Sequence, residues 1–156
     1  MKNIVTLRQT HIGRYLHELN IDYKKITVKH IQTHGYENFT EGQLNILGQL
    51  NLKSPTAMVS LVSKVGLSKQ AVSRMINLCV KHHYIKLIPC KIDSRAKSIV
   101  FTQHGLALMN VAAESIKLAE DIFREKLGTD NFASLKQQLQ QAYTAMQHSN
   151  VDTPNV

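Results

Sequence analysis

The sequence predicts a mainly α-helical chain with a small β-hairpin wing, built as a winged helix-turn-helix between longer flanking helices. Two short segments with helical apolar spacing meet at Gly66-Leu67-Ser68, a β-prone run follows them, and helical spacing returns on both sides. With 156 residues, 43% of them hydrophobic, the chain is long enough for one core and too short for two comfortable domains. We therefore expect a single domain.

The first short helix is expected to open at Ser54-Pro55, because serine caps unpaired N–H groups and proline at the first helical position loses no hydrogen bond. Gly66 should end it in a left-handed conformation. Apolar residues follow at helical spacing: Met58, Leu61, Val62 and Val65.

The second short helix should begin at Ser68, which can cap it. One face is apolar and is expected to point inward: Val72, Met75, Ile76 and Cys79. The opposite face carries no carboxylate, and its side chains have the lengths needed to reach phosphates or base edges in a major groove: Ser68, Lys69, Gln70, Ser73, Arg74 and Asn77. We interpret this face as a DNA-binding surface.

The wing is predicted from a change of pattern after Tyr84. Strand-like residues 85–90 and 99–101 flank the polar residues 91–98, as in two strands joined by a charged loop. Pro89 favours an edge or the end of a strand, since proline cannot donate to a central ladder.

From Ser54 to Gly105 the chain resembles the winged helix-turn-helix domain of the MarR family of bacterial transcriptional regulators. The resemblance rests on the wing signature together with Gly66-Leu67-Ser68 at the turn. The signature residues stand at the family's spacing: Asp93, Arg95, Ile99, Phe101, Thr102 and Gly105.

The resemblance implies a homodimer whose terminal helices interleave. Two recognition helices would then lie roughly 34–36 Å apart and bind pseudo-palindromic double-stranded DNA. The family resemblance favours a repressor over an activator. The resemblance also implies control by a small aromatic or phenolic acid held between the dimerisation region and the DNA-binding heads, although no motif here identifies the pocket residues.

In the wing, the resemblance implies that Arg95 enters the minor groove and that Asp93 holds Arg95 or the wing in position. Family members often carry a second acid and a second arginine just after this pair, where this chain has Ala96 and Lys97. On the recognition helix, Arg74 could contact a guanine edge, contact only a phosphate, or be a free surface arginine, and the sequence leaves these alternatives open.

The formal charge of +8 is concentrated in residues 53–98, where Asp93 is the only acid. Such a segment suits a polyanion, because each neutralised phosphate releases a counterion. Its nine cations are Lys53, Lys64, Lys69, Arg74, Lys81, Lys86, Lys91, Arg95 and Lys97.

The flanking segments supply the expected dimerisation helices, at about 1–34 and 103–147. The first keeps helical phase over 4–34, but Asn20-Ile21-Asp22 weaken its middle, so a bend there or an early stop is open. Thr102 should cap the long helix to about Leu127, whose apolar residues cover more than one face and indicate a partner surface. A last amphipathic helix spans about 130–147, and 148–156 is expected to be a flexible tail.

The region of about 40–102 forms the expected DNA-binding part. It begins with a short helix in which Thr40 caps and Gln43 completes a capping box, with Leu44, Leu47 and Leu50 facing inward. This helix should brace the two that follow.

Several classes of protein are excluded or disfavoured. No signal peptide or span of roughly 20 apolar residues is present, so we expect a soluble cytoplasmic protein without a membrane partner. No hydrolase elbow, phosphate loop or paired acids appear, so no enzyme and no cofactor are predicted. The eight histidines are interpreted as surface or helix-end residues, and no metal site is assigned.

Cys79 and Cys90 do not form a disulfide framework and fit a reducing compartment. Cys79 is predicted to be a small buried hydrophobic residue, and Cys90 is predicted to be the more exposed thiol. The alternative is that a cysteine, with Cys90 the candidate beside Lys91, senses oxidants.

Two other functions remain open from the sequence. The winged helix could be a protein-interaction scaffold whose basic face is incidental, or the chain could coat DNA without sequence preference. A scaffold should tolerate neutral residues at Lys69, Arg74 and Arg95, whereas a regulator should lose DNA affinity at each.

Overall fold

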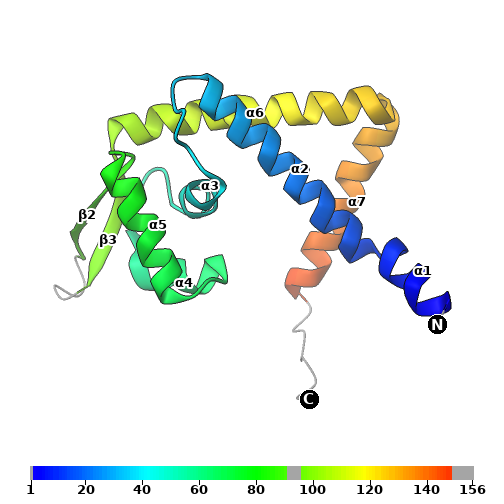
Figure 1. The fold of residues 1–156 in the computed structure, drawn as a ribbon, viewed down its shortest axis with the longest axis horizontal. Coiled ribbons are helices and arrows are strands. Elements are labelled where there is room, and N and C mark those ends of the chain that lie inside the picture. Colours follow the sequence, from blue (N-terminus) through cyan, green and yellow to red (C-terminus); the bar gives the residue numbers. More distant parts are fainter. Residues whose placement is uncertain (1, 91–95, 149–156) are drawn as a thin grey trace, which may run out of the picture. The chain divides into compact units, whose positions relative to one another are not determined.

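A computed structural model describes residues 2–90 and 96–148 (Figure 1). The chain consists of two compact units, residues 1–116 and 117–156. The predicted fold class is confirmed: the chain is mainly helical with one small antiparallel sheet. Residues 149–156 of the predicted tail lie outside the described residues.

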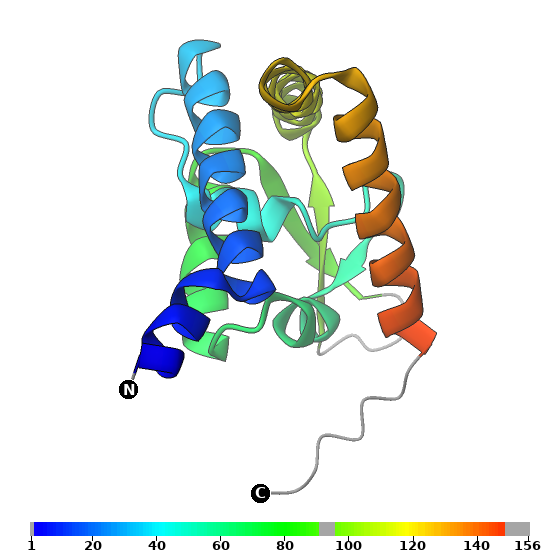
Figure 2. The ribbon, with the colours of Figure 1, turned by 90° about the vertical axis from the view of Figure 1, so that its right-hand side faces the viewer.

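Seven helices and three strands follow one another along the described chain (Figures 1 and 2). The helix α6 runs from the first unit into the second. The elements are α1 (Lys2–Thr10), α2 (Ile12–Thr33), α3 (Glu41–Leu47), β1 (Thr56–Ala57), α4 (Met58–Val65), α5 (Lys69–Lys81), β2 (Ile85–Pro89), β3 (Lys97–Phe101), α6 (Gln103–Leu127) and α7 (Thr129–His148).

The first expected helix is broken, and the break lies at a different residue from the weak point that the sequence indicates. His11 has extended backbone, with φ −75° and ψ 146°, and its ring Nδ1 accepts a hydrogen bond from the Arg14 N–H at 3.1 Å. The imidazole therefore starts α2 as an N-cap. Asn20-Ile21-Asp22 remain helical within α2, because neighbouring turns outweigh their weak local propensity.

The start of the first short helix was predicted wrongly. Ser54 and Pro55 lie in a loop, where the Asn51 side chain accepts the N–H groups of Lys53 and Ser54 at 2.8 and 3.1 Å. The chain then forms β1, and α4 begins only at Met58. The serine and proline signals thus mark a turn, for which both residue types are equally suited.

The sheet has three strands in the order β1-β3-β2, not the two of a simple hairpin. β1 pairs with β3 through Thr56 opposite Ile99, and β2 pairs with β3 from Ile85–Phe101 to Pro89–Lys97. Pro89 therefore ends an edge strand, as predicted.

The predicted capping residues are confirmed at three helices. Thr40 and Gln43 form the complete capping box of α3. The Ser68 hydroxyl accepts the Ala71 N–H at 3.2 Å, and the Thr102 hydroxyl accepts the Gly105 N–H at 3.0 Å. These contacts fix where the helices begin.

The core of the first unit joins the long helices to the predicted DNA-binding region. Its fully buried side chains come from every helix of this unit except α1, and from the sheet. They include Ile31, Phe39, Ile46, Leu61, Ile76, Ile99 and Leu108. Ile46 is buried although the sequence pattern singled out only the three leucines of this region; Leu47 and Leu50 are buried and Leu44 is half-buried.

The second unit comprises the end of α6 and α7. Gly128 connects them with φ 80°, a conformation that favours glycine. The Arg124 guanidinium lies 5.2 Å from the centre of the Phe132 ring, and Lys136 Nζ is 2.7 Å from Glu120 Oε1. Across 2–90 and 96–148, we find no helix with the length and apolar character needed to cross a membrane.

Candidate nucleic-acid interface

The helix α5 presents the polar face that the sequence predicts. Val72, Ile76 and Cys79 are buried, which turns the opposite side of the helix outward. On that side Ser73 is half-buried and the other predicted residues are exposed: Ser68, Lys69, Gln70, Arg74 and Asn77. No acidic residue occurs between Lys69 and Lys81, so the exposed face offers donors and positive charge.

Both ends of α5 are fixed. The preceding Gly66 has φ 68°, which allows the tight turn from α4, and Ser68 caps the first turn. At the other end His83 has φ 58°, and the Tyr84 N–H donates to the Cys79 carbonyl at 3.0 Å. This is a Schellman ending with histidine where glycine is usual. A helix held in this way can present its side chains in a defined orientation.

Thr102 connects the end of α5 to the wing and to α6. Its N–H donates to the Tyr84 carbonyl at 3.0 Å, and its hydroxyl contacts the His83 carbonyl. The helix α3 packs against α5 from another side, as the sequence predicts for a bracing helix. The predicted DNA-binding face is thus supported by contacts with several elements.

The wing places Lys86 and Lys97 at exposed positions on β2 and β3. Lys91, Asp93 and Arg95, to which the sequence assigns DNA contact and wing positioning, lie outside the described residues.

Seven cations of the basic segment belong to described residues, and within residues 4–90 and 96–147 none of them forms a salt bridge. In contrast, Lys24 and Lys25 of α2 pair with Glu41 and Asp22. The seven are Lys53, Lys64, Lys69, Arg74, Lys81, Lys86 and Lys97. Their charge is therefore available to an external polyanion.

The two cysteines differ as expected. Cys79 is fully buried, and this burial raises the pKa of its thiol to about 12, while Cys90 is half-buried at the end of β2. Since the thiolate is the reactive form, Cys79 is poorly suited to oxidant sensing.

We expect a thiol reagent such as Ellman's reagent to modify Cys90 but not Cys79 in the native protein at pH 8. A thiol with a pKa of about 12 has a negligible thiolate fraction below pH 10 and is also shielded by the core. Cys90→Ser should therefore abolish the native reaction, and denaturant should restore one reacting thiol. Rapid native modification of Cys90→Ser would contradict the buried assignment.

A cavity of about 620 Å³ opens in the first unit between α2, α3, α4 and α6. Its lining combines apolar side chains with amide and ammonium groups, including Leu44, Val65, Met109, Ile116, Gln49 and Lys64. The size suits a small organic molecule. Sequence patterns did not identify these residues, because four separate elements contribute them.

A helix-turn-helix followed by a small antiparallel wing defines a winged-helix protein. None of the protein-family models matches the chain. The regulator TcaR of Staphylococcus aureus, an HTH-type transcriptional regulator, is 30% identical over 137 residues, which cover 85% of this chain and 88% of TcaR. The chain belongs to the MarR family. It is a DNA-binding transcriptional regulator and not an enzyme.

Solved structures share this fold. MarR from E. coli in its apo form has a TM-score of 0.74 at 18% identity, covering 85% of this chain and 96% of MarR. A mutant of E. coli MarR with operator DNA has a TM-score of 0.69 at 18% identity, over 90% and 95% of the two chains. A MarR regulator from Methanosarcina mazei gives 0.71 at 18% identity, over 86% and 88%.

Proposed function

We propose that this chain acts as a homodimer that binds a pseudo-palindromic operator sequence-specifically, as a repressor. The observation that carries the proposal is the exposed face of α5, which bears donors and cations without a salt bridge among the described side chains, on a helix fixed at both ends. The E. coli MarR structure with operator DNA supports the same mode of binding. Because genomic DNA of prokaryotes lies in the cytoplasm, the proposal places the protein there.

The exposed residues of α5 are expected to contact two different parts of the DNA, the phosphates and the base edges. Ser68, Lys69 and Gln70 stand at the first turn, where N–H groups and short donors suit phosphates. Arg74 and Asn77 lie further along the exposed face and suit base edges, since arginine and asparagine form bidentate contacts with guanine and adenine. Ser73 is the half-buried member of this set.

The wing completes the proposed contact. Lys97 is exposed at the start of β3 and would reach a phosphate beside the minor groove. Lys91 would add a further contact to DNA. The family resemblance implies that Arg95 enters the minor groove, with Asp93 holding it or the wing in position.

The proposed dimer uses apolar side chains that the single chain leaves exposed. On α1 and α2 these include Leu7, Ile12 and Leu16, which are 64%, 72% and 45% exposed. On α7, Tyr143 and Met146 are 66% and 62% exposed. Exposing so many large hydrophobic side chains to water is energetically unfavourable. We therefore expect a second copy of the chain to cover them.

We expect Arg74→Ala to weaken operator binding roughly five- to 150-fold, which corresponds to about 1–3 kcal/mol for a bidentate base contact. The measurement is fluorescence anisotropy with the DNA upstream of the chain's own reading frame and with scrambled DNA, at several salt concentrations. Arg74→Lys keeps the charge but loses the planar guanidinium. It should restore affinity for scrambled DNA more than for the operator.

The matched control is Arg14→Ala, which removes the same side chain from an exposed position on α2. Equal effects of the two alanine variants would contradict the assigned role of Arg74. Equal, weak binding to both DNAs would instead favour a scaffold. Salt-sensitive binding without sequence preference would favour a DNA-coating protein.

We also propose that the cavity between α2, α3, α4 and α6 binds a small aromatic or phenolic acid that controls operator affinity. Its apolar lining suits an aromatic ring, and Lys64 supplies a cation with no salt bridge among the described side chains. The operator assay tests this with salicylate against neutral salicylamide. Unchanged operator affinity in both would contradict ligand control by this class.

A further inference from the structure

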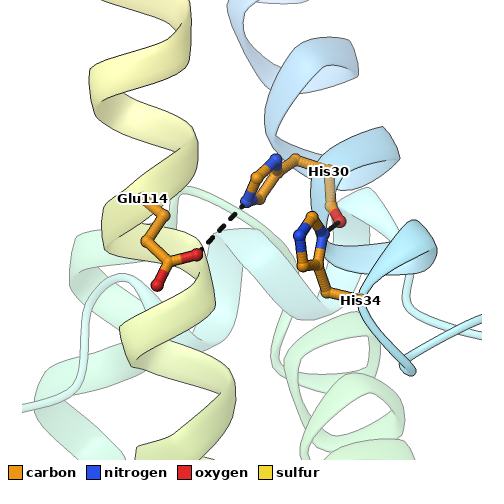
Figure 3. A group of neighbouring side chains, drawn as sticks. All are labelled: His30, His34 and Glu114. Atoms are coloured by element: carbon orange, nitrogen blue, oxygen red, sulfur yellow. Dashed lines mark hydrogen bonds and ion pairs between the residues drawn. The ribbon is translucent and has the colours of Figure 1, made fainter.

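Three potential metal ligands meet on the first unit, and none of them belongs to α5 or to the wing strands. His30 and His34 lie one turn apart at the end of α2, and Glu114 faces them from α6 (Figure 3). One ligand atom from each residue lies within 4.8 Å of the other two. The two imidazole rings are 4.1 Å apart between centroids.

His30 carries a polar atom that the protein itself leaves unsatisfied. Its Nε2 is buried and has no hydrogen-bond partner among the described residues, and the Glu114 Oε2 that faces it is 3.7 Å away. A buried nitrogen without a partner is unfavourable. The gap between this nitrogen and the carboxylate is too long for a hydrogen bond, but the two atoms can both coordinate one ion.

His34 is oriented by the backbone of its neighbour. Its Nδ1 lies 2.7 Å from the His30 carbonyl oxygen, and since a carbonyl only accepts, Nδ1 must donate. The lone pair of His34 is then on Nε2. This arrangement, in which one ring nitrogen donates to a carbonyl and the other is left to bind, is typical of histidine ligands to metals.

We propose that His30, His34 and Glu114 bind one Zn²⁺ ion. Two imidazoles and one carboxylate are a donor set that zinc accepts, with a water in the fourth position. Zinc bonds of about 2.0–2.1 Å place tetrahedral ligand atoms roughly 3.3 Å apart. The present separations are up to 4.8 Å, so the side chains must draw together. Glu114, whose side chain is 66% exposed, has the freedom to do so.

The bound ion would tie the end of α2 to the middle of α6. The alternative is a simple ion pair between protonated His30 and Glu114, which needs no metal and leaves His34 uninvolved. The proposed site requires neither DNA nor a second chain, so its test is independent of operator binding.

The test is a zinc titration of untagged, chelator-treated protein in competition with a chromophoric zinc chelator at pH 7.5. We expect one tightly bound Zn²⁺ per chain, and His34→Gln and Glu114→Gln should each weaken it about tenfold or more. His17→Gln is the matched control, because it removes an exposed histidine from the same helix, and it should leave the affinity unchanged.

A second readout is the thermal stability of the protein. Zn²⁺ should raise the Tm of the wild type and of His17→Gln more than that of Glu114→Gln, because a ligand stabilises only the folded state that binds it. His34 and Glu114 are exposed, so circular dichroism should show both variants folded. An absence of tight zinc binding, or tight binding that His34→Gln and Glu114→Gln retain, would overturn the proposal.

Discussion

Replacing Gly105 with alanine is expected to destabilise the fold by roughly 3 kcal/mol, because the added methyl group has no space. An ideal Cβ at Gly105 would lie 1.9 Å from the carbonyl oxygen of Tyr84 and 2.7 Å from its carbonyl carbon. Both atoms belong to the backbone, so no side-chain rotation relieves the clash. Tyr84 is also fixed in place, since its carbonyl accepts the Thr102 N–H at 3.0 Å.

The direction of this effect is opposite to the usual one. Within a helix, alanine is normally about 1 kcal/mol more favourable than glycine. Gly13→Ala on α2 is therefore the control: its nearest new contact, at 3.3 Å, is the side-chain atom His11 Nδ1, which caps α2, so only a small shift of this ring is needed. Thermal unfolding followed by circular dichroism should show a Tm lowered by about 6–12 °C for Gly105→Ala alone. Similar Tm values for the two variants would refute the close approach of α6 to Tyr84.

The sequence predicted those elements whose ends are set by local chemistry. Gly66, Ser68, Thr40 and Thr102 act through contacts within a few residues, and each was placed correctly. Ser54-Pro55 shows the limit of such signals, because the same residues begin a helix or form a turn. These residues form a turn in the folded chain because β1, which follows them, pairs with a strand more than forty residues later. Local sequence patterns do not encode such a long-range pairing.

The site was predictable only where one element carries it. The face of α5 follows from helical spacing: five of its six predicted residues are exposed and Ser73 is half-buried, and their contact with DNA stays a prediction. The cavity could not be found, because four elements line it. The spacing of four between His30 and His34 is visible in the sequence, but Glu114 belongs to α6 and comes close to them only in the folded chain. The wing residues Asp93 and Arg95 remain predictions from the family resemblance.

The double substitution Ile12→Glu/Leu16→Glu is expected to separate the proposed dimer and weaken operator binding about 100-fold or more. Both side chains are exposed in the single chain, so two carboxylates there should leave its own core intact. In an interface, however, they would be buried without partners, which is strongly unfavourable. A monomer engages one half-site at a time and loses the effective concentration that links the two recognition helices.

Sedimentation velocity and operator anisotropy on the same samples measure the two consequences together. Arg14→Glu/His17→Glu serves as the control, since helical spacing places these exposed residues on the other side of α2. Ile12→Lys/Leu16→Lys tests whether the glutamate pair acts by repelling the DNA phosphates. Two buried lysines should dissociate the dimer as well, but they would not repel DNA. If the glutamate pair left a dimer with unchanged operator affinity, the exposed face of α2 would not be the dimer interface. If it gave a monomer that still bound the operator tightly, recognition would not depend on two linked half-sites.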